Sequence, residues 1–405
     1  MVQIEPFEVE QWMDRYENTP GILNIAETCA ASVSVDELEG FSTDKSIECP
    51  LSRSLKLTYG HIRGSPAFRE SVAALLNNGA PLTTTSQNPP RLEAEDVLIT
   101  QGAIAGNFLL FYTLVGPGDH VICVYPTYQQ LYSVPQSLGA SVSLWRLQQE
   151  DGFIPDIAEL ELLVKPNTKL IVINNPNNPT GATTPESVLA AIVAFAQQRK
   201  LCILSDEVYS PLYHSLRTGQ TAPPSILSFG YGKAVATGSL SKAFALAGIR
   251  VGWIASRNRD LLDALAHARD YTAISVSQLD DQVATYALSS AVVPSLMKRN
   301  MNLARANLQL LSAFVEKHSS VCSWVKPTAG TTAFIQFCKD GVPVDDVELA
   351  VQLVEWKVMF LPAGRCFGHG KDFKGYVRVG YVCHTDVLKA GLEILSKYVE
   401  EKLLS

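Results

Sequence analysis

A lysine that follows two serines and precedes an arginine gives the strongest chemical signal in the chain. Ser239 and Ser241 stand just before Lys242, and Arg250 follows the lysine by eight residues. Hydroxyl groups and a guanidinium in this arrangement can converge on a phosphate, while the lysine amine can reach an aldehyde. A lysine by itself is more often a solvated surface residue. The surrounding pattern instead predicts that Lys242 acts as a nucleophile beside a bound phosphate group.

An acidic residue ends a second informative segment. Asp206 closes the apolar run that begins at Ile203, and Tyr209 comes three residues later. At the end of a buried strand, a carboxylate can keep the ring nitrogen of a cofactor protonated, so that the ring accepts electrons released at a substrate carbon. The alternative is that Asp206 caps the next helix and that Tyr209 is an ordinary half-buried aromatic residue. The presence of Lys242 in the same chain favours the cofactor role.

Two Asn-Pro steps and a closing glycine characterise the segment from Asn174 to Gly181. Proline restricts both itself and the residue before it, so the segment predicts a rigid, extended turn. A plain surface loop is the alternative interpretation. Because the turn follows an apolar run, and open α/β sheets bind ligands beyond the carboxyl ends of their strands, we expect it near the site.

The segment from Thr100 to Asn107 leaves a predicted strand and opens a helix. Free backbone N–H groups at a helix start attract anions, and we expect those of Ala103 and Ile104 to bind a phosphate. The segment contains no Gly-x-Gly-x-x-Gly pattern, which disfavours a dinucleotide site. Close packing of helix on strand at Gly102 is the alternative.

An arginine stands in an apolar run near the end of the chain, from Tyr376 to Tyr381. The planar guanidinium of Arg378 matches a carboxylate with two parallel hydrogen bonds, so this residue is a candidate clamp for a substrate carboxylate. An edge-strand arginine whose charged end reaches solvent is the alternative.

Together these segments resemble the fold type I enzymes that use pyridoxal 5'-phosphate (PLP), and more narrowly the class I and II aminotransferases. The likeness is carried by Ser-x-Ser-Lys at Lys242, by the Gly-x-Arg-x-Gly-Trp that ends at Trp253, and by the Asn-Pro-Thr-Gly that ends at Gly181. It extends from about Tyr59 to Arg378, which is most of the chain. The resemblance implies that Lys242 carries PLP as a Schiff base and moves the α-proton of an amino acid.

The resemblance implies further roles around the cofactor ring. Asp206 binds the pyridine nitrogen, Asn178 and Tyr209 bind the 3'-oxygen, and Tyr128 stacks on the ring. The residues that we expect at the cofactor phosphate are those already suggested by the helix start and by the segment around Lys242, namely Ala103, Ile104, Ser239, Ser241 and Arg250.

Other implied roles concern the substrate and a second subunit. Arg378, with Asn178, holds the α-carboxylate of the substrate. Tyr59 stands in a segment that in the family reaches the phosphate of the neighbouring subunit, which implies a homodimer with shared active sites.

The reaction that follows proton removal stays open. Transamination to a 2-oxo acid is the first expectation, yet β- or γ-elimination, replacement and cyclisation need the same residues. The N-terminal piece, from Trp12–Tyr16 to Ile22–Thr28, lacks the usual Gly-rich Pro-Asp turn. It looks more like the opening of capreomycidine synthase, a PLP enzyme of the same group that cyclises a hydroxylated arginine. A catalytically silent binding module would lack the lysine, the carboxylate or the phosphate arginine, and all three are present here.

The elements that must position these residues alternate between apolar runs and helical stretches. Continuous runs, which are typical of strands covered on both faces, occur at 97–100, 120–124, 169–173 and 201–204. Turn signals stand at 116–119, 174–181 and 237–239. We therefore expect an α/β fold with a mostly parallel central sheet flanked by helices, as in the large domain that the resemblance to aspartate aminotransferases implies.

The character of the chain changes near residue 285. A helix is predicted over 293–318, strands over 331–337 and 376–381, and a final helix over 386–403. We expect a large PLP-binding domain of residues 46–284 and a smaller α+β domain formed by residues 1–45 and 285–405. Residues 82–91 are the best candidate for an exposed loop.

The composition bounds the partners and the location. The 405 residues carry a net charge of −7 without a basic stripe, so a small molecule is a better partner than nucleic acid. No apolar run is long enough for a membrane span and no leader-like start is present, so we expect a cytoplasmic protein.

Eight dispersed cysteines show no metal-binding spacing, and we expect most of them to be reduced core thiols without a metal site. The sequence does not indicate which substrate side chain the site accepts. The candidates for lining the substrate pocket, each more often a packed or surface residue, are Tyr132, Tyr271, His369 and His384.

Overall fold

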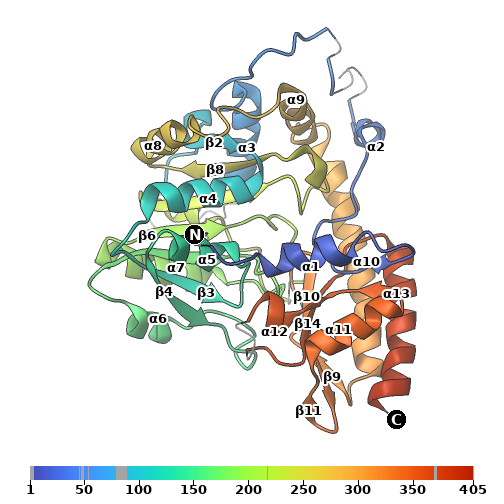
Figure 1. The fold of residues 1–405 in the computed structure, drawn as a ribbon. Helices are drawn as coiled ribbons and strands as arrows, with labels where there is room; N and C mark the ends of the chain where they lie inside the picture. The colour runs from blue at the N-terminus through green and yellow to red at the C-terminus, as the bar shows by residue number, and fades with distance from the viewer. Residues whose placement is uncertain are drawn as a thin grey trace.

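The protein was analysed as a computed structural model that describes residues 4–44, 46, 50–52, 54–78, 89–216, 218–368 and 372–404. Two sheets organise the chain, one built from the middle of the sequence and one from its C-terminal part (Figure 1). Cys49, His369 and most of the predicted loop at 82–91 lie outside the described residues. Within those residues, no helix combines the length and the apolar character needed to cross a membrane.

A seven-stranded sheet forms the centre of the larger part. Strands β3 to β7 run parallel, whereas β8 is antiparallel to both of its neighbours. This arrangement confirms the predicted fold class. The strands, in their order across the sheet, are β2 (Val97–Thr100), β8 (Gly252–Ser256), β7 (Ala234–Ser239), β6 (Cys202–Asp206), β5 (Thr168–Asn174), β3 (His120–Tyr125) and β4 (Ser141–Arg146).

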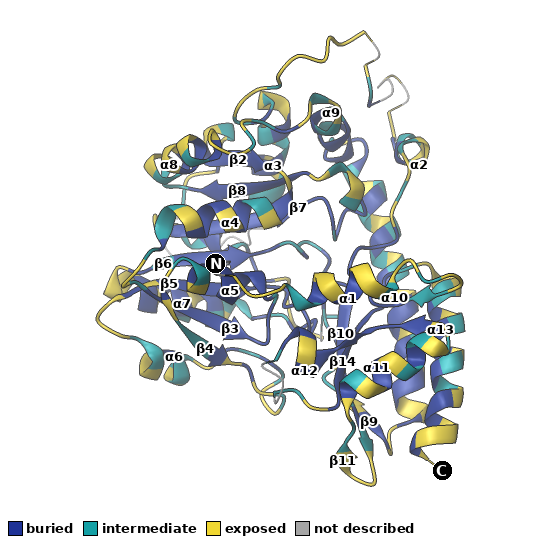
Figure 2. Ribbon diagram, viewed as in Figure 1, coloured by how far each residue is buried: buried dark blue, intermediate teal, exposed yellow. Residues whose placement is uncertain are grey.

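The continuous apolar runs are explained by burial on both faces of this sheet. Along β3, Ile122 and Val124 belong to one hydrophobic cluster, while Val121 and Cys123 belong to the other. Strands β3, β7 and β8 are accordingly dark in Figure 2, whereas the edge strand β4 is partly exposed. The associated helices are α3 (Pro66–Asn78), α4 (Gly102–Leu114), α5 (Gln130–Ser137), α6 (Ile157–Leu163), α7 (Glu186–Arg199), α8 (Arg259–Arg269) and α9 (Gln278–Ala287), with the 3-10 turns η1 (Ala94–Asp96), η2 (Ile226–Phe229) and η3 (Ala247–Ile249).

The turn predicted at residues 237–239 is wrong, because these residues complete strand β7. Gly238 pairs with Trp253 of β8, and a Cβ atom on Gly238 would come within 2.5 Å of the indole ring. The glycine therefore allows two strands to pack closely around a large side chain, and the chain does not reverse there.

The C-terminal part contains an antiparallel sheet centred on β10 (Thr332–Lys339). Its other strands are β9 (Cys322–Trp324), β11 (Val342–Pro343), β13 (Leu361–Pro362) and β14 (Tyr376–Gly380). The predicted long helix is present as α10 (Val293–Lys317). The remaining helices are α11 (Asp346–Glu355), α12 (Ala363–Cys366), α13 (Thr385–Tyr398) and the π-helical turn η4 (Val399–Leu403).

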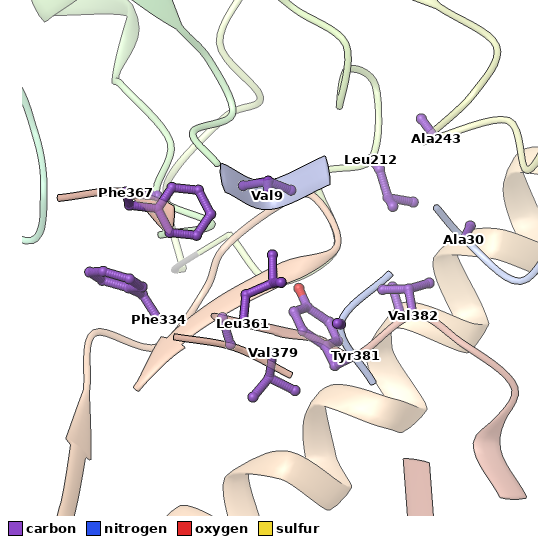
Figure 3. Packing of buried hydrophobic residues seen from close by; sticks show 14 of the residues in the cluster. Val9, Ala30, Leu212, Ala243, Phe334, Leu361, Phe367, Val379, Tyr381 and Val382 are labelled. Carbon is purple, nitrogen blue, oxygen red and sulfur yellow. The ribbon is translucent and has the colours of Figure 1, made fainter. Parts of the chain in front are cut away.

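The N-terminal residues pack with this C-terminal part. Strand β1 (Leu23–Asn24) pairs in parallel with β12 (Val358–Met359). Helix α1 (Glu8–Tyr16) lies across the junction between the two sheets (Figure 1), and α2 (Val35–Gly40) follows β1. Figure 3 shows Val9 of α1 in one cluster with Phe334 and Phe367. The domain boundaries near residues 46 and 284 stay predictions.

Candidate active site

A cavity of about 580 Å³ lies between the ends of the central strands, the start of α4, helix α1 and strand β14. Tyr59 does not line it, since its side chain is 79% exposed elsewhere on the surface. The other predicted site residues all line this cavity, namely Ala103, Ile104, Tyr128, Asn178, Asp206, Tyr209, Ser239, Ser241, Lys242, Arg250 and Arg378.

Lys242 follows strand β7 and extends toward the N-terminal segment. Its Nζ atom donates to the hydroxyl of Thr28 at 2.6 Å and lies 3.5 Å from both Glu27 Oε1 and Cys29 Sγ. Burial favours the neutral amine, but the acidic neighbours Cys29 and Glu27 outweigh it and raise the pKa of Lys242 above its usual value. The backbone carbonyl of Lys242 also accepts from Ala30 N at 3.1 Å, which joins the two loops.

Glu27 is a site residue that the sequence analysis missed. Burial alone would raise the pKa of its carboxyl, yet the charge of Lys242 and hydrogen bonds from the following residues lower it to about 2. Its Oε1 atom accepts from the backbone N–H groups of Thr28 and Cys29 at 2.6 and 3.1 Å. The only sequence signal is a polar triplet, Glu27 to Cys29, that directly follows the apolar pair Ile25-Ala26.

Asp206 ends strand β6 and is almost fully buried. Its carboxylate accepts from Asn107 Nδ2 at 3.0 Å and from Val208 N at 3.2 Å. Burial raises the pKa of Asp206 to about 6, and these hydrogen bonds limit the rise. Asn107, which the sequence analysis assigned no role, also accepts from the Thr237 hydroxyl at 2.8 Å.

The Asn-Pro segment links the central sheet to Arg378. Asn174 donates to the backbone carbonyl of Asp206 at 3.0 Å and accepts from the backbone N–H of Asn178 at 2.7 Å. Asn178 in turn accepts from Arg378 Nη1 at 3.2 Å, while Nη2 donates to the carbonyl of Ala26 at 2.8 Å. These bonds hold the Arg378 guanidinium at the wall of the cavity.

Backbone N–H groups, hydroxyls and a guanidinium form an anion cradle at the other end of the cavity. The Ser239 hydroxyl donates to the Ser241 hydroxyl at 2.8 Å, and Arg250 Nη1 lies 3.5 Å from the same Ser241 oxygen. A Cβ atom at Gly252 would come within 2.6 Å of Ala103 N, so only glycine allows β8 to approach the start of α4 this closely. The cradle suits a phosphate group.

Two tyrosines complete the walls. Tyr209 is buried, and burial raises the pKa of its phenol, although the charges of Lys242 and Arg378 oppose the rise. The Tyr128 hydroxyl donates to Glu10 Oε1 at 3.0 Å. Tyr128 thereby ties helix α1 to the cavity.

The residues proposed for substrate specificity lie elsewhere. Tyr132 packs edge-on against Tyr125 in the core, Tyr271 is 93% exposed, and His384 is exposed at the start of α13. Instead, the cavity is lined by polar residues of α1 and its C-terminal cap, which the sequence analysis did not single out, namely Glu10, Gln11, Asp14 and Glu17.

Two curated proteins are similar to this chain over most of its length. Capreomycidine synthase of Streptomyces vinaceus is 29% identical over 306 residues, which cover 74% of each chain. Aspartate/prephenate aminotransferase of Thermus thermophilus is 26% identical over 368 residues, which cover 87% of each chain.

Solved structures share the fold over nearly the whole chain. A PLP-dependent aminotransferase from Streptococcus suis is 36% identical with a TM-score of 0.85, covering 98% of both chains. The PLP-dependent cyclase OrfR is 24% identical with a TM-score of 0.83 and the same coverage, which shows a common fold. The model of the family "aminotransferase class I and II" matches residues 50–395. The chain therefore belongs to the class I and II aminotransferase family.

Proposed function

We propose that this protein is a PLP-dependent enzyme that acts at the α-carbon of an amino acid, and that it is an aminotransferase producing a 2-oxo acid. One observation carries the proposal: the amine of Lys242, the carboxylate of Asp206 and the anion cradle line a single cavity. The family is PLP-dependent, and its members act on amino acids.

The residues present fit PLP. The cradle of Ser239, Ser241, Arg250 and the start of α4 matches its phosphate, and the buried Asp206 matches its pyridine nitrogen. Asn178 and Tyr209 would hold the ring oxygen, and Tyr128 would cover the ring face. When bound, PLP supplies an aldehyde for an amine and a ring that withdraws electrons from the α-carbon.

Arg378 is suited to the α-carboxylate of the substrate. Its side chain is 3% exposed, and its Nε atom has no hydrogen-bond partner among the described residues. A buried guanidinium that lacks a carboxylate partner favours an anionic ligand. With the carboxylate held there, the neutral amine of Lys242 could accept the α-proton and return it to another carbon, which is the proton movement that transamination requires.

A second candidate function is cyclisation, β- or γ-elimination, or replacement, and Glu27 favours it. Its carboxylate lies 3.5 Å from Lys242 Nζ, and its lowered pKa keeps it ionised at neutral pH. A side-chain nitrogen that attacks the carbon skeleton must be held in position, and an ionised carboxylate beside the lysine can orient it by accepting a hydrogen bond from it. Capreomycidine synthase, a relative named above, supports keeping this candidate.

We also propose that two copies of the chain form a homodimer. Several large apolar side chains are exposed on the part of the larger domain that includes α4, and a cavity of about 960 Å³ lies there. Tyr59 is exposed as well, so in a dimer it can reach the cradle of the partner. The exposed apolar residues that line this cavity include Phe108, Tyr112 and Tyr271.

Product analysis tests the proposed reaction. The purified protein is incubated with PLP and a panel of amino acids, with and without 2-oxoglutarate, and the products are identified by mass spectrometry. Transamination yields a 2-oxo acid and glutamate in equal amounts, only with the acceptor. Consumption of an amino acid without the acceptor, with loss of water or ammonia, would establish the second candidate instead.

The cofactor has a separate test. Borohydride reduction is expected to fix a phosphopyridoxyl group on the peptide that contains Lys242, and the Lys242→Ala variant serves as the control. If no group is fixed on this peptide, the proposed function is wrong.

A further inference from the structure

We infer that the substrate carries a positive charge on its side chain, as an ammonium or a guanidinium, and that the acidic face of helix α1 recognises it. This inference rests on the proposed function, because it concerns the same cavity. It assigns a substrate class to a site whose specificity the sequence left open.

Helix α1 presents its carboxylates at one side. Glu10, Asp14 and Glu17, the last at the C-terminal cap of the helix, are spaced by four and three residues, so they lie on one helical face. All three are exposed, and all three line the cavity. The alternation of exposed and buried segments along α1 is visible in Figure 2.

The rest of the helix is anchored, so this face has a defined position. Trp12 is 2% exposed, and Arg365 of α12 forms an ion pair of 2.5 Å with Glu8. On the cavity side, the Tyr128 hydroxyl donates to Glu10. The acidic face is therefore held against the cavity from both sides.

The charges that line the cavity do not balance. Its acidic residues are Glu10, Asp14, Glu17, Glu27 and Asp206, whereas its basic residues are Lys242, Arg250 and Arg378. In the proposed function each basic residue has a partner, and Asp206 is matched by the ring nitrogen of the cofactor. In the described part of the chain, no lysine, arginine or histidine pairs with Glu10, Asp14 or Glu17 within 4.0 Å.

A second observation in the same cavity points to a charged ligand. Arg378 is buried, and its Nε atom lacks a partner among the described residues, which indicates an anionic group such as the α-carboxylate. When the α-carboxylate of an amino acid is bound by Arg378, the charges of the cavity that remain unpaired are the carboxylates of α1. A cationic side chain satisfies them, whereas the side chain of aspartate or glutamate would be repelled.

Matched substrate pairs test this inference. Arginine is compared with citrulline, and lysine with norleucine, because each pair differs mainly in charge. We expect kcat/KM of the PLP-loaded enzyme to be at least about tenfold higher for the cationic member, and the difference to shrink as salt is raised from about 0.05 to about 0.5 M. Dissociation constants, measured by calorimetry with borohydride-reduced holoenzyme, are expected to show the same order without turnover.

Substitutions on α1 locate the effect. Asp14→Asn and Glu17→Gln are each expected to weaken the binding of the cationic ligand about three- to fivefold, and the double variant about tenfold, with little change for the neutral member. Glu161→Gln, on the exposed surface of α6, is the matched control and should change neither the affinity for the cationic ligand nor that for the neutral ligand. Circular dichroism and the PLP absorption of each variant show that the fold and the cofactor are retained.

The outcomes separate this inference from the proposed function. If PLP is fixed on Lys242 but the neutral members bind and react as well as the cationic ones, the substrate class is wrong and the proposed function stands. If the α1 variants bind the cationic and the neutral ligand of a pair equally more weakly, the acidic face does not recognise the charge of the side chain. If no PLP is fixed on Lys242, the proposed function itself fails.

Discussion

Asn107 donates a hydrogen bond of 3.0 Å to the carboxylate of Asp206, the group that would hold the cofactor ring. The other end of the same amide accepts from Thr237 at 2.8 Å. Because the amide can donate only through its nitrogen, these two bonds orient it and stabilise the charged form of Asp206.

Replacing Asn107 by alanine is expected to weaken PLP binding about tenfold and to destabilise the protein by about 2 kcal/mol. Without the donor, the pKa of Asp206 rises further, and the Thr237 hydroxyl loses its partner inside the core. The PLP dissociation constant from fluorescence quenching and urea denaturation measure the two effects. Asn302→Ala, on the exposed side of α10, is the control, and an unchanged PLP affinity in Asn107→Ala would contradict the prediction.

Two buried carboxyl groups, those of Asp206 and Glu207, are expected to lower the stability of the PLP-free protein as the pH rises from about 4.5 to about 7. His120 and His214 act in the opposite direction, because burial lowers their pKa values to about 4. Burial raises the pKa of Asp206 to about 6 and that of Glu207 to about 7. In this range the folded chain retains protons on these two carboxyl groups that the unfolded chain has released, so at these groups a rising pH favours unfolding.

Glu207→Gln is expected to remove most of this dependence, on the order of 3 kcal/mol between about pH 5 and about pH 7.5. The glutamine oxygen can still accept from Ile226 N, which bonds Glu207 at 2.9 Å in the native protein. Urea denaturation at the two pH values measures the slope, with Glu161→Gln as the control. If the free energy of unfolding changes between the two pH values as much in Glu207→Gln as in the native protein, another group is responsible for the dependence.

Gly380→Ala is expected to destabilise the protein by about 3 kcal/mol and to displace Glu27 from Lys242. A Cβ atom at Gly380 would overlap the backbone carbonyl of Glu27, so strand β14 and the loop that carries Glu27 could not keep their contact. Chemical denaturation measures the loss. Gly116→Ala is the matched control, because nothing lies within 4 Å of a Cβ atom there. Equal stabilities of the two variants would refute this account.

Mixed dimers test whether Tyr59 acts in the partner subunit. The inactive Lys242→Ala and the impaired Tyr59→Phe proteins are denatured together and refolded. If Tyr59 reaches the partner, each heterodimer contains one site with both native residues, and about a quarter of all sites regain activity. Each variant refolded alone is the control, and an activity no greater than the average of the two would place Tyr59 outside the partner's site.

The sequence alone determined the residues that surround Lys242 and the strands that support them. Ser239, Ser241, Lys242 and Arg250 lie within one short segment, so their chemistry is readable from local spacing. The strands could be predicted because residues of a parallel sheet that is buried on both faces form continuous apolar runs. Asp206 was found for the same reason, since it ends one of those runs.

The tertiary structure alone revealed Glu27, Asn107 and the acidic face of α1. Glu27 is 215 residues from Lys242, and contacts across such a separation leave no local pattern of spacing. The same reason explains the wrong turn at Gly238, where the requirement for glycine comes from Trp253 on a neighbouring strand. Local sequence thus identified most of the residues that line the cavity around Lys242, while the packing of distant segments decided which further charges line it.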